Sequence, residues 1–158
     1  MKIKEGKVLH NFAKKLWPYN RSLTGEGTLQ TLKNIKEINP NLIIKSIKSG
    51  KKVYDWKIPL EWSVDEAFIK DNKNKKIVDF KDNNLHLVSY SRPINKIMNL
   101  KEIKNKLYSI KEMPNAIPYI TSYYKKDWGF CIQDKVKKKL KSGKYKVLIK
   151  SKFIKGHL

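Results

Sequence analysis

Residues 16–28, Leu-Trp-Pro-Tyr-Asn-Arg-Ser-Leu-Thr-Gly-Glu-Gly-Thr, place a proline and two glycines between two amphipathic segments. Pro18 cannot continue a helix, because it has no N–H and its ring clashes with the preceding turn. Thr24 can cap a second helix. Gly25 and Gly27 are poor helix residues, but they allow the backbone to approach another group closely. The stretch predicts two helices joined by a specific junction, although a glycine-softened helix start with a buried tryptophan is a simpler alternative.

The two flanking segments have apolar residues at three- and four-residue steps, which is the spacing of one helix face. Upstream these residues are Val8, Leu9, Phe12, Ala13, Leu16 and Trp17, and downstream they are Leu29, Leu32, Ile35 and Ile38. Each helix is therefore expected to have one apolar face.

The composition indicates a globular protein. A chain of 158 residues suits one domain or two small ones, and 40% hydrophobic residues are enough for a core. No apolar run approaches the length of about 20 residues that a membrane span needs, and the first residues lack the apolar core of a secretory signal. The single cysteine, Cys131, excludes an internal disulfide and fits a reducing compartment, so we expect a cytoplasmic protein. Its apolar neighbours predict a buried small hydrophobe rather than a nucleophile.

The formal charge of +22 raises the question of a polyanionic partner. Only Arg21 and Arg92 are arginines among 36 basic residues, whereas arginine is the usual choice for nucleic-acid recognition. The lysines are spread along the chain with abundant Ile and Asn, as in a genome biased towards A and T. The densest run, 135–141, keeps Val136 and Leu140 four residues apart, which predicts a docked helix with a lysine-covered face. Nucleic acid is not the expected partner. A stand-alone basic binding module for nucleic acid or acidic polysaccharide remains the alternative function.

The expected elements occur in the order helix, helix, strand, a β-rich block, helix and strand. Two helices are expected within residues 5–38, and shorter ones at 100–104 and 134–140. The expected strands are 42–47, 67–70, 77–80, 85–90, 106–110, 128–132 and 145–149, with a hairpin turn at 71–76.

This order is the one that a small β domain inserted into an α/β domain produces. Residues 1–50 would be the first helices and strand of the outer domain, residues 51–140 the β-rich insertion, and residues 141–158 the return to the outer domain. So small an outer part cannot form a doubly wound domain of ordinary size. We therefore expect an amino-terminal piece of a longer protein, the alternative being a complete small α+β domain.

Familiar catalytic motifs are absent from the sequence. It has no glycine-rich phosphate loop, His-Glu-x-x-His, Cys-x-x-Cys or Gly-x-Ser-x-Gly. His10, His86 and His157 have no second ligand at metal-binding spacing, so each is expected to be a structural histidine.

Polar residues embedded in aromatic segments are the remaining candidates for a site. The segments are Asp55–Pro59, Glu61-Trp62, Asn83–His86, Ser89–Pro93, Pro118–Tyr124 and Trp128–Phe130. Aromatic bodies with a few polar atoms are typical of pocket walls, but they are equally typical of the core of a small β domain.

Six ordered motifs, at 17–27, 55–59, 61–62, 82–91, 118–124 and 128–131, resemble a bacterial family over nearly the whole chain. Its members are aminopeptidase-like proteins with an inserted domain of unknown function, often found near surface-polysaccharide biosynthesis genes. The resemblance implies an α/β fold (zinc-exopeptidase-like, here partial) with an inserted β-rich α+β subdomain. It implies zinc for full-length members, whose metal ligands lie downstream, and none bound by this chain. A winged-helix segment follows in the family.

The resemblance turns the aromatic segments into a hypothesis about function. The chain would be the amino-terminal part of a zinc-dependent, aminopeptidase-like hydrolase whose catalytic centre lies elsewhere, acting on a peptide-like or amide-containing small substrate. This chain alone is expected to be inactive, with no catalytic residue assigned. The candidates for the pocket wall are Arg21, which could hold an anionic group, and Trp56, Trp62, His86, Tyr90, Tyr123 and Trp128.

Overall fold

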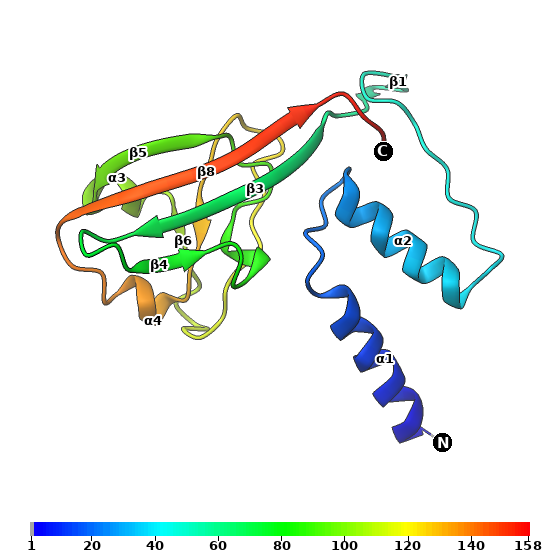
Figure 1. Cartoon of the computed structure of the whole chain (residues 1–158), viewed down its shortest axis with the longest axis horizontal. Helices are drawn as coiled ribbons and strands as arrows, with labels where there is room; N and C mark the ends of the chain where they lie inside the picture. The colour runs from blue at the N-terminus through cyan, green and yellow to red at the C-terminus, as the bar shows by residue number, and fades with distance from the viewer. Residues whose placement is uncertain (1) are drawn as a thin grey trace. The chain divides into compact units, whose positions relative to one another are not determined.

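The computed structural model describes residues 2–158, with side chains from Glu5 onward, and the chain forms two units. Unit 1 consists of the residues up to Glu61 together with Phe153–Leu158, and unit 2 is Trp62–Lys152. Unit 2 is continuous in sequence, and both of its flanks belong to unit 1 (Figure 1). These limits lie downstream of the transitions expected near residues 50 and 141. Mixed α/β structure is present, as expected.

Unit 1 begins with two helices, α1 (Lys2–Leu16) and α2 (Glu26–Ile38). Helix α1 ends just before Pro18, as predicted. The prediction that Thr24 caps α2 is wrong. The N-cap residue is Gly25 with φ of 97°, a backbone conformation that favours glycine, and the Thr24 hydroxyl donates instead to the Leu60 carbonyl at 3.3 Å.

The strand expected at residues 42–47 is not formed, so that prediction is wrong. Only the end of this segment finds a partner, because Ile47 and Leu158 exchange two backbone hydrogen bonds of 2.9 Å. Ile43 remains 76% exposed. An alternating pattern cannot make a strand without a neighbouring strand to bond. Further along the chain, β1 (Lys52–Val53) and β2 (Trp56–Lys57) pair as a short antiparallel ribbon in unit 1.

Unit 2 contains a four-stranded sheet in the order β4–β3–β8–β5. The strands are β3 (Glu61–Lys70), β4 (Lys76–Asp79), β5 (Ile94–Asn99) and β8 (Lys144–Ile154). The predicted hairpin turn at 71–76 is confirmed. Asp71 Oδ1 accepts hydrogen bonds from the backbone N–H groups of Lys73 and Lys75, both at 2.9 Å, and Asn74 adopts φ of 61°.

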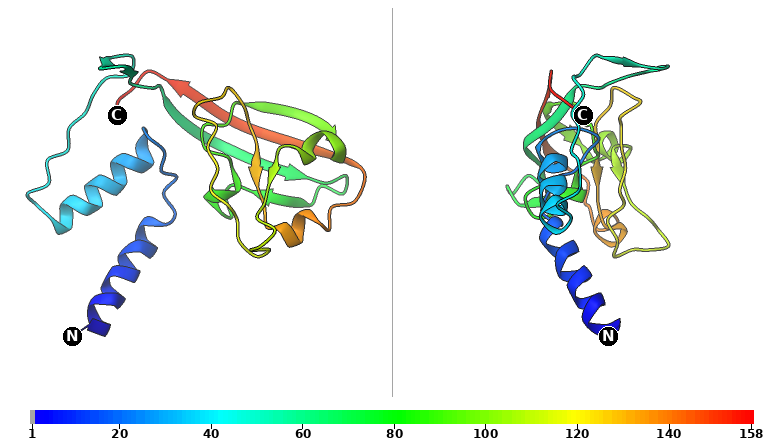
Figure 2. Two further views of the ribbon diagram at one scale, coloured as in Figure 1. Left: turned by 180° about the vertical axis from the view of Figure 1, so that it is seen from behind. Right: turned by 90° about the vertical axis from the view of Figure 1, so that its right-hand side faces the viewer.

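Short elements cover one face of this sheet (Figures 1 and 2). They are the 3-10 helix η1 (Asn84–His86), α3 (Leu100–Lys104), β6 (Leu107–Tyr108), β7 (Phe130–Cys131) and α4 (Asp134–Lys137). Strands β6 and β7 pair in parallel. The predicted helix at 100–104 is confirmed, and the helix expected at 134–140 ends earlier, at Lys137.

The strand expected at 85–90 is wrong. The His86 N–H donates to the Asn83 carbonyl at 3.0 Å, which closes a 3-10 turn in place of a strand, and the Asn83 side chain caps this turn by accepting from the Leu85 N–H at 2.9 Å. Beyond it only two isolated bridges form, Leu87 with Phe130 and Ser89 with Thr121. The strand β5 was not predicted, because its apolar residues Ile94, Ile97 and Met98 do not alternate with polar ones.

The two units differ in how much apolar surface they bury. In unit 2 the largest fully buried side chains are Phe130, Ile103, Ile132, Ile149, Val78, Val88 and Val147. Among the described residues of unit 1, Ile58 is the buried large apolar side chain. Unit 1 also holds most of the exposed ones: Val8, Leu9, Trp17, Leu23, Leu29, Ile38, Ile43, Tyr54, Trp56, Leu60 and Ile154. Unit 2 has its own core, and unit 1 has very little.

Candidate functional site

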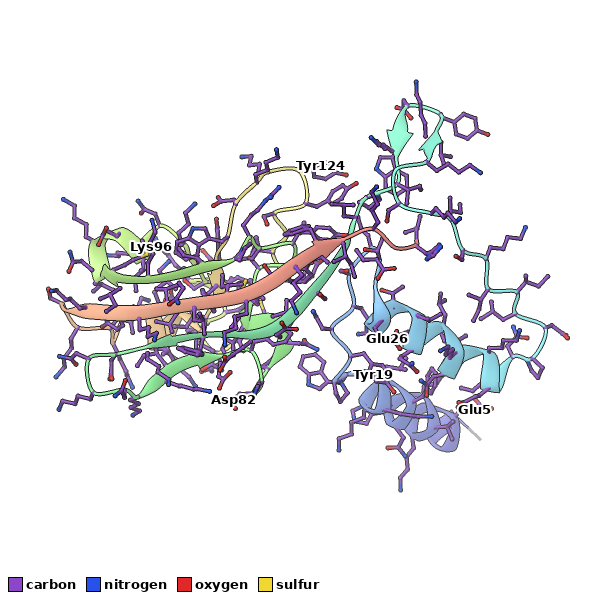
Figure 3. The ribbon with its side chains drawn as sticks, turned by 45° about the horizontal axis from the view of Figure 1, so that its top comes forward. Glu5, Tyr19, Glu26, Asp82, Lys96 and Tyr124 are labelled. Carbon is purple, nitrogen blue, oxygen red and sulfur yellow. The ribbon has the colours of Figure 1, made fainter. Side chains whose placement is uncertain are left out.

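Four aromatic rings form a row that runs from the core of unit 2 to its surface. The Trp62 ring stacks on Tyr90, with centroids 5.6 Å apart and planes 15° from parallel. Tyr90 meets Tyr123 edge-to-face at 5.1 Å, and Tyr123 meets Tyr124 in the same way at 4.7 Å. Exposure rises along this aromatic row from 3% at Trp62 to 90% at Tyr124, which is labelled in Figure 3.

Ser91 holds the base of the aromatic row in place. It is fully buried, and its carbonyl oxygen accepts hydrogen bonds from Trp62 Nε1 at 3.0 Å and from the Ser151 hydroxyl at 2.8 Å. Its own hydroxyl donates to the Val88 carbonyl at 2.6 Å and accepts from the Gly129 N–H at 3.2 Å. One residue therefore connects two strands of the sheet to the segment that contains Trp128.

Tyr90, next to Ser91, adopts φ of 63°, which is uncommon for a residue other than glycine. Such a conformation costs on the order of 1 kcal/mol or more and persists only where the surroundings require it. Here the ring is buried against Trp62, and this contact offsets the cost.

A hollow of about 270 Å³ adjoins the outer end of the aromatic row. We call it the aromatic hollow. It is lined by Val88, Tyr108, Ile120, Thr121, Ser122, Tyr124, Lys125, Asp127 and Trp128. Gly129 allows the wall to close, because a Cβ atom there would lie 2.7 Å from Tyr108 Cε2.

The aromatic hollow contains an ionised carboxylate. Asp127 Oδ1 accepts hydrogen bonds from Lys106 Nζ at 2.5 Å and from the Trp128 N–H at 2.8 Å. The hydrogen bond from Lys106 outweighs partial burial and lowers the pKa of Asp127. Lys106 Nζ also lies 5.8 Å from the centroid of the Trp128 ring, within range of a cation–π contact.

This chemistry is that of binding rather than of covalent catalysis. Aromatic faces receive a flat apolar group, and Asp127 can accept hydrogen bonds from N–H or O–H donors. The hydroxyl of Ser122, one of those in the lining, is part of the scaffold: it donates to the carbonyl oxygens of Ser89 at 3.1 Å and Asp127 at 3.4 Å.

The structure brings together four of the seven residues proposed for the pocket wall. Trp62, Tyr90 and Tyr123 belong to the aromatic row, and Trp128 lines the aromatic hollow. Tyr124 connects the two, because it is the last ring of the row and also lines the hollow.

The other three candidates belong neither to the aromatic row nor to the lining of the aromatic hollow. His86 Nδ1 lies 2.8 Å from the Cys131 carbonyl, and because a carbonyl only accepts, this nitrogen must be the donor. Arg21 and Trp56 belong to unit 1. The Arg21 guanidinium donates to the Leu16 carbonyl at 3.0 Å, at the carboxyl end of α1, where a cation is favourable. Its role towards a substrate anion stays a prediction.

Sequence reasoning left out several residues of the site. Tyr124 follows the candidate Tyr123, and Asp127 precedes the candidate Trp128. Their position next to these candidates is a signal from which both could have been predicted. Tyr108 lies in β6, and no local pattern marks it, because only the parallel pairing of β6 with β7 brings it to the aromatic hollow.

The described residues contain no group of three His, Cys, Asp or Glu side chains that could hold a metal ion. The zinc implied for full-length relatives stays a prediction. Within residues 2–158, no helix combines the length and the apolar character needed to cross a bilayer.

Comparison with known proteins agrees with the division into two units. The family model described as a domain of unknown function, DUF2172, matches residues 61–152, almost the extent of unit 2. A Clostridium acetobutylicum protein named "putative polysaccharide biosynthesis protein with aminopeptidase-like domain" is 41% identical over 153 residues, which are 97% of this chain and 35% of that protein.

A crystal structure of a "putative peptidase" from Clostridium acetobutylicum matches with a TM-score of 0.91 and 40% identity, over 98% of this chain and 36% of the other. The chain thus spans about a third of the length of both relatives. Through its match over most of its length, this chain belongs to the family of the domain of unknown function DUF2172.

Proposed function

We propose that this chain is the amino-terminal part of a zinc-dependent, aminopeptidase-like hydrolase of zinc-exopeptidase-like fold. Unit 2 would be the inserted β-rich domain, and its aromatic hollow would form part of the substrate pocket. The names of the two relatives support this proposal, and so does the fact that the likeness covers only about a third of each.

The difference between the two cores is the observation on which the proposal depends. Unit 2 buries its apolar residues internally, whereas Val8 and Leu9 in α1 and Trp17, the residue after it, are 62%, 69% and 47% exposed. An excess of exposed large apolar side chains in one unit favours an interaction surface there. The partner that fits best is the remaining two thirds of an aminopeptidase-like protein, because it would complete the α/β layer to which α1 and α2 belong.

The aromatic hollow would bind the substrate and would not react with it. Tyr124 and Trp128 supply faces against which an apolar side chain of a peptide-like substrate can pack, and the carboxylate of Asp127 can accept a hydrogen bond from its amine or amide N–H. In full-length members zinc would polarise the scissile carbonyl and activate water. The described residues of this chain would orient the substrate and limit access of water to it.

A complementation experiment tests the proposal. The purified chain is mixed with the remaining carboxyl-terminal portion of the Clostridium acetobutylicum relative, and assembly is measured by sedimentation velocity and by peptide hydrolysis with added zinc. We expect a one-to-one complex that hydrolyses peptides, although neither part does so alone. Leu9→Glu should prevent assembly, whereas Lys96→Glu, on an exposed position of β5 (Figure 3), should not. Peptidase activity and stoichiometric zinc in this chain by itself would refute the proposal.

The pocket role has a separate test in the assembled protein. Trp128→Ala and Tyr124→Ala should raise KM for peptides several-fold with a smaller change in kcat. Tyr54→Ala is the matched control, because Tyr54 is 93% exposed in the turn between β1 and β2. An unchanged KM in both hollow variants would remove the aromatic hollow from the pocket.

A further inference from the structure

A second hollow in unit 2, independent of the proposed function, gathers positive charge. We call it basic hollow A. It has a volume of about 500 Å³ and is lined by Leu100, Lys104, Leu107, Ser109, Lys111, Asp134, Lys137, Lys138 and Leu140. Its four lysines come from three separate segments: α3, the chain after β6, and α4 with the residue that follows it.

The carboxylate in basic hollow A is already engaged. Asp134 Oδ2 lies 2.7 Å from Lys138 Nζ, and Asp134 Oδ1 accepts a hydrogen bond from the Ser109 hydroxyl at 2.9 Å. Lys104, Lys111 and Lys137 thus bring positive charge that Asp134 cannot balance.

Lys137 shows the consequence of this excess. Its side chain is partly buried, and Nζ donates to the Leu107 carbonyl. Burial lowers the pKa of Lys137, and repulsion from Lys104 and Lys111 lowers it further against the attraction of Asp134. The ammonium is held in place at an electrostatic cost, which a bound anion would relieve.

A third hollow, basic hollow B, also contains several lysines and shares Leu140 with basic hollow A. It has a volume of about 350 Å³ and is lined by Asp71, Asn72, Lys73, Lys75, Ile77, Lys139, Leu140, Lys141, Ser142, Gly143, Lys144 and Tyr145. The hairpin turn between β3 and β4 and the start of β8 meet at this end of the sheet (Figure 1).

The two basic hollows are neighbours along the chain. Lys137 and Lys138 line basic hollow A, Lys139 and Lys141 line basic hollow B, and Leu140 lines both. Lys137 and Lys141 are four positions apart in the sequence, so no more than about 15 Å separates their Cα atoms. A ligand with several negative groups can therefore contact both hollows at once.

We propose that basic hollows A and B form one track that binds an acidic polysaccharide, with lysine ammonium groups paired to its carboxylate or phosphate groups. Two observations favour a polysaccharide over nucleic acid. The lining contains no arginine, the usual residue for reading bases and clasping phosphates. Its aromatic residue, Tyr145, is 5% exposed and offers no stacking surface for a base.

The test compares three probes on the full 158-residue chain. Labelled polygalacturonate, neutral dextran and a single-stranded thymidine oligonucleotide of matched charge are titrated by fluorescence anisotropy at 150 mM salt. We expect binding of polygalacturonate, at least tenfold weaker binding of the oligonucleotide, and none of dextran. Oligonucleotide binding as tight as that of polygalacturonate, or no binding of polygalacturonate, would overturn the proposal.

Matched variants distinguish binding at the basic hollows from general attraction to the many surface lysines. Replacing Lys104, Lys111 and Lys137 by glutamine should weaken polygalacturonate binding at least tenfold. The control variant replaces the exposed Lys96, Lys126 and Lys146 of unit 2 by glutamine, which removes the same charge. It should weaken polygalacturonate binding less than threefold. Equal losses would overturn the proposal. Because Lys137 is partly buried, the double variant Lys104→Gln/Lys111→Gln, at two exposed positions, is measured as well and should weaken binding at least threefold.

Discussion

The backbone of Gly27 packs directly against the carbonyl group of Asn20, so closely that a Cβ atom at Gly27 would lie 2.2 Å from the Asn20 oxygen. The junction is further held by the Thr28 hydroxyl, which donates to the Ser22 carbonyl at 2.6 Å. The segment between α1 and α2 is therefore fixed mainly by backbone contacts that tolerate no side chain at residue 27.

Gly27→Ala should destabilise unit 1 by about 1–3 kcal/mol, because the added methyl group must displace backbone rather than a flexible side chain. Far-UV circular dichroism during urea unfolding measures this change. Gly6→Ala, in α1, is the control: apart from its chain neighbours and the backbone of its own helix, no atom of the described residues lies within 4 Å of its Cβ position, and alanine should strengthen the helix by about 0.5–1 kcal/mol. Similar effects of the two substitutions would contradict the packed junction.

Trp62→Phe and Ser151→Ala should each cost unit 2 about 0.5–1.5 kcal/mol through lost hydrogen bonds, with an additional packing cost for Trp62→Phe. Both side chains donate to the Ser91 carbonyl, so the double variant leaves this buried oxygen without either donor. The combined loss should exceed the sum of the single losses. Urea unfolding of the four proteins gives the coupling, and strict additivity would argue against a shared acceptor.

Asp127 should contribute to a pH-dependent part of the stability of unit 2. The hydrogen bond from Lys106 lowers its pKa in the folded state, so its contribution is complete above the unfolded pKa of about 3.9 and is lost as the pH falls through the folded value. Asp127→Asn should therefore lower the free energy of unfolding at pH 7 and flatten its acid limb. Unfolding between pH 2 and 7 measures this, and an unchanged acid limb would exclude the contribution.

Cys131 should react with thiol reagents only when unit 2 opens. It is fully buried, and burial raises the pKa of its thiol to about 12, which leaves almost no thiolate at neutral pH. The rate of reaction with a disulfide reagent should rise with urea in parallel with unfolding. A cysteine introduced by Tyr54→Cys, at an exposed position, is the control and should react at once in the native protein. Rapid native reaction of Cys131 would contradict its burial.

Features that depend on near neighbours could be predicted from the sequence. Pro18 ends α1, Gly27 permits a close backbone contact, the turn at 71–76 reverses the chain, and 100–104 is helical. Each follows from a backbone restriction or a local hydrogen bond. The expected strand at 42–47 failed for the opposite reason, because a strand requires a partner that no local pattern reveals.

The candidate site could be predicted only in part. Its aromatic residues were recognisable as polar–aromatic segments, and Trp62, Tyr90, Tyr123 and Trp128 were selected on that basis. Their grouping was not predictable, since it depends on the positive φ of Tyr90 and on the hydrogen bonds of Ser91 to residues far away in the sequence.

The sequence by itself determined where α1 ends, that the chain turns at 71–76 and how strongly basic the protein is, because these depend on residue chemistry and short-range sterics. Only the tertiary structure decided that the apolar surface is unequally buried between the two units. It also decided that scattered lysines meet around Leu140 and that four aromatic rings form a row. These features arise from pairing and packing between distant segments, and the free energy of burial, rather than local preference, selects them.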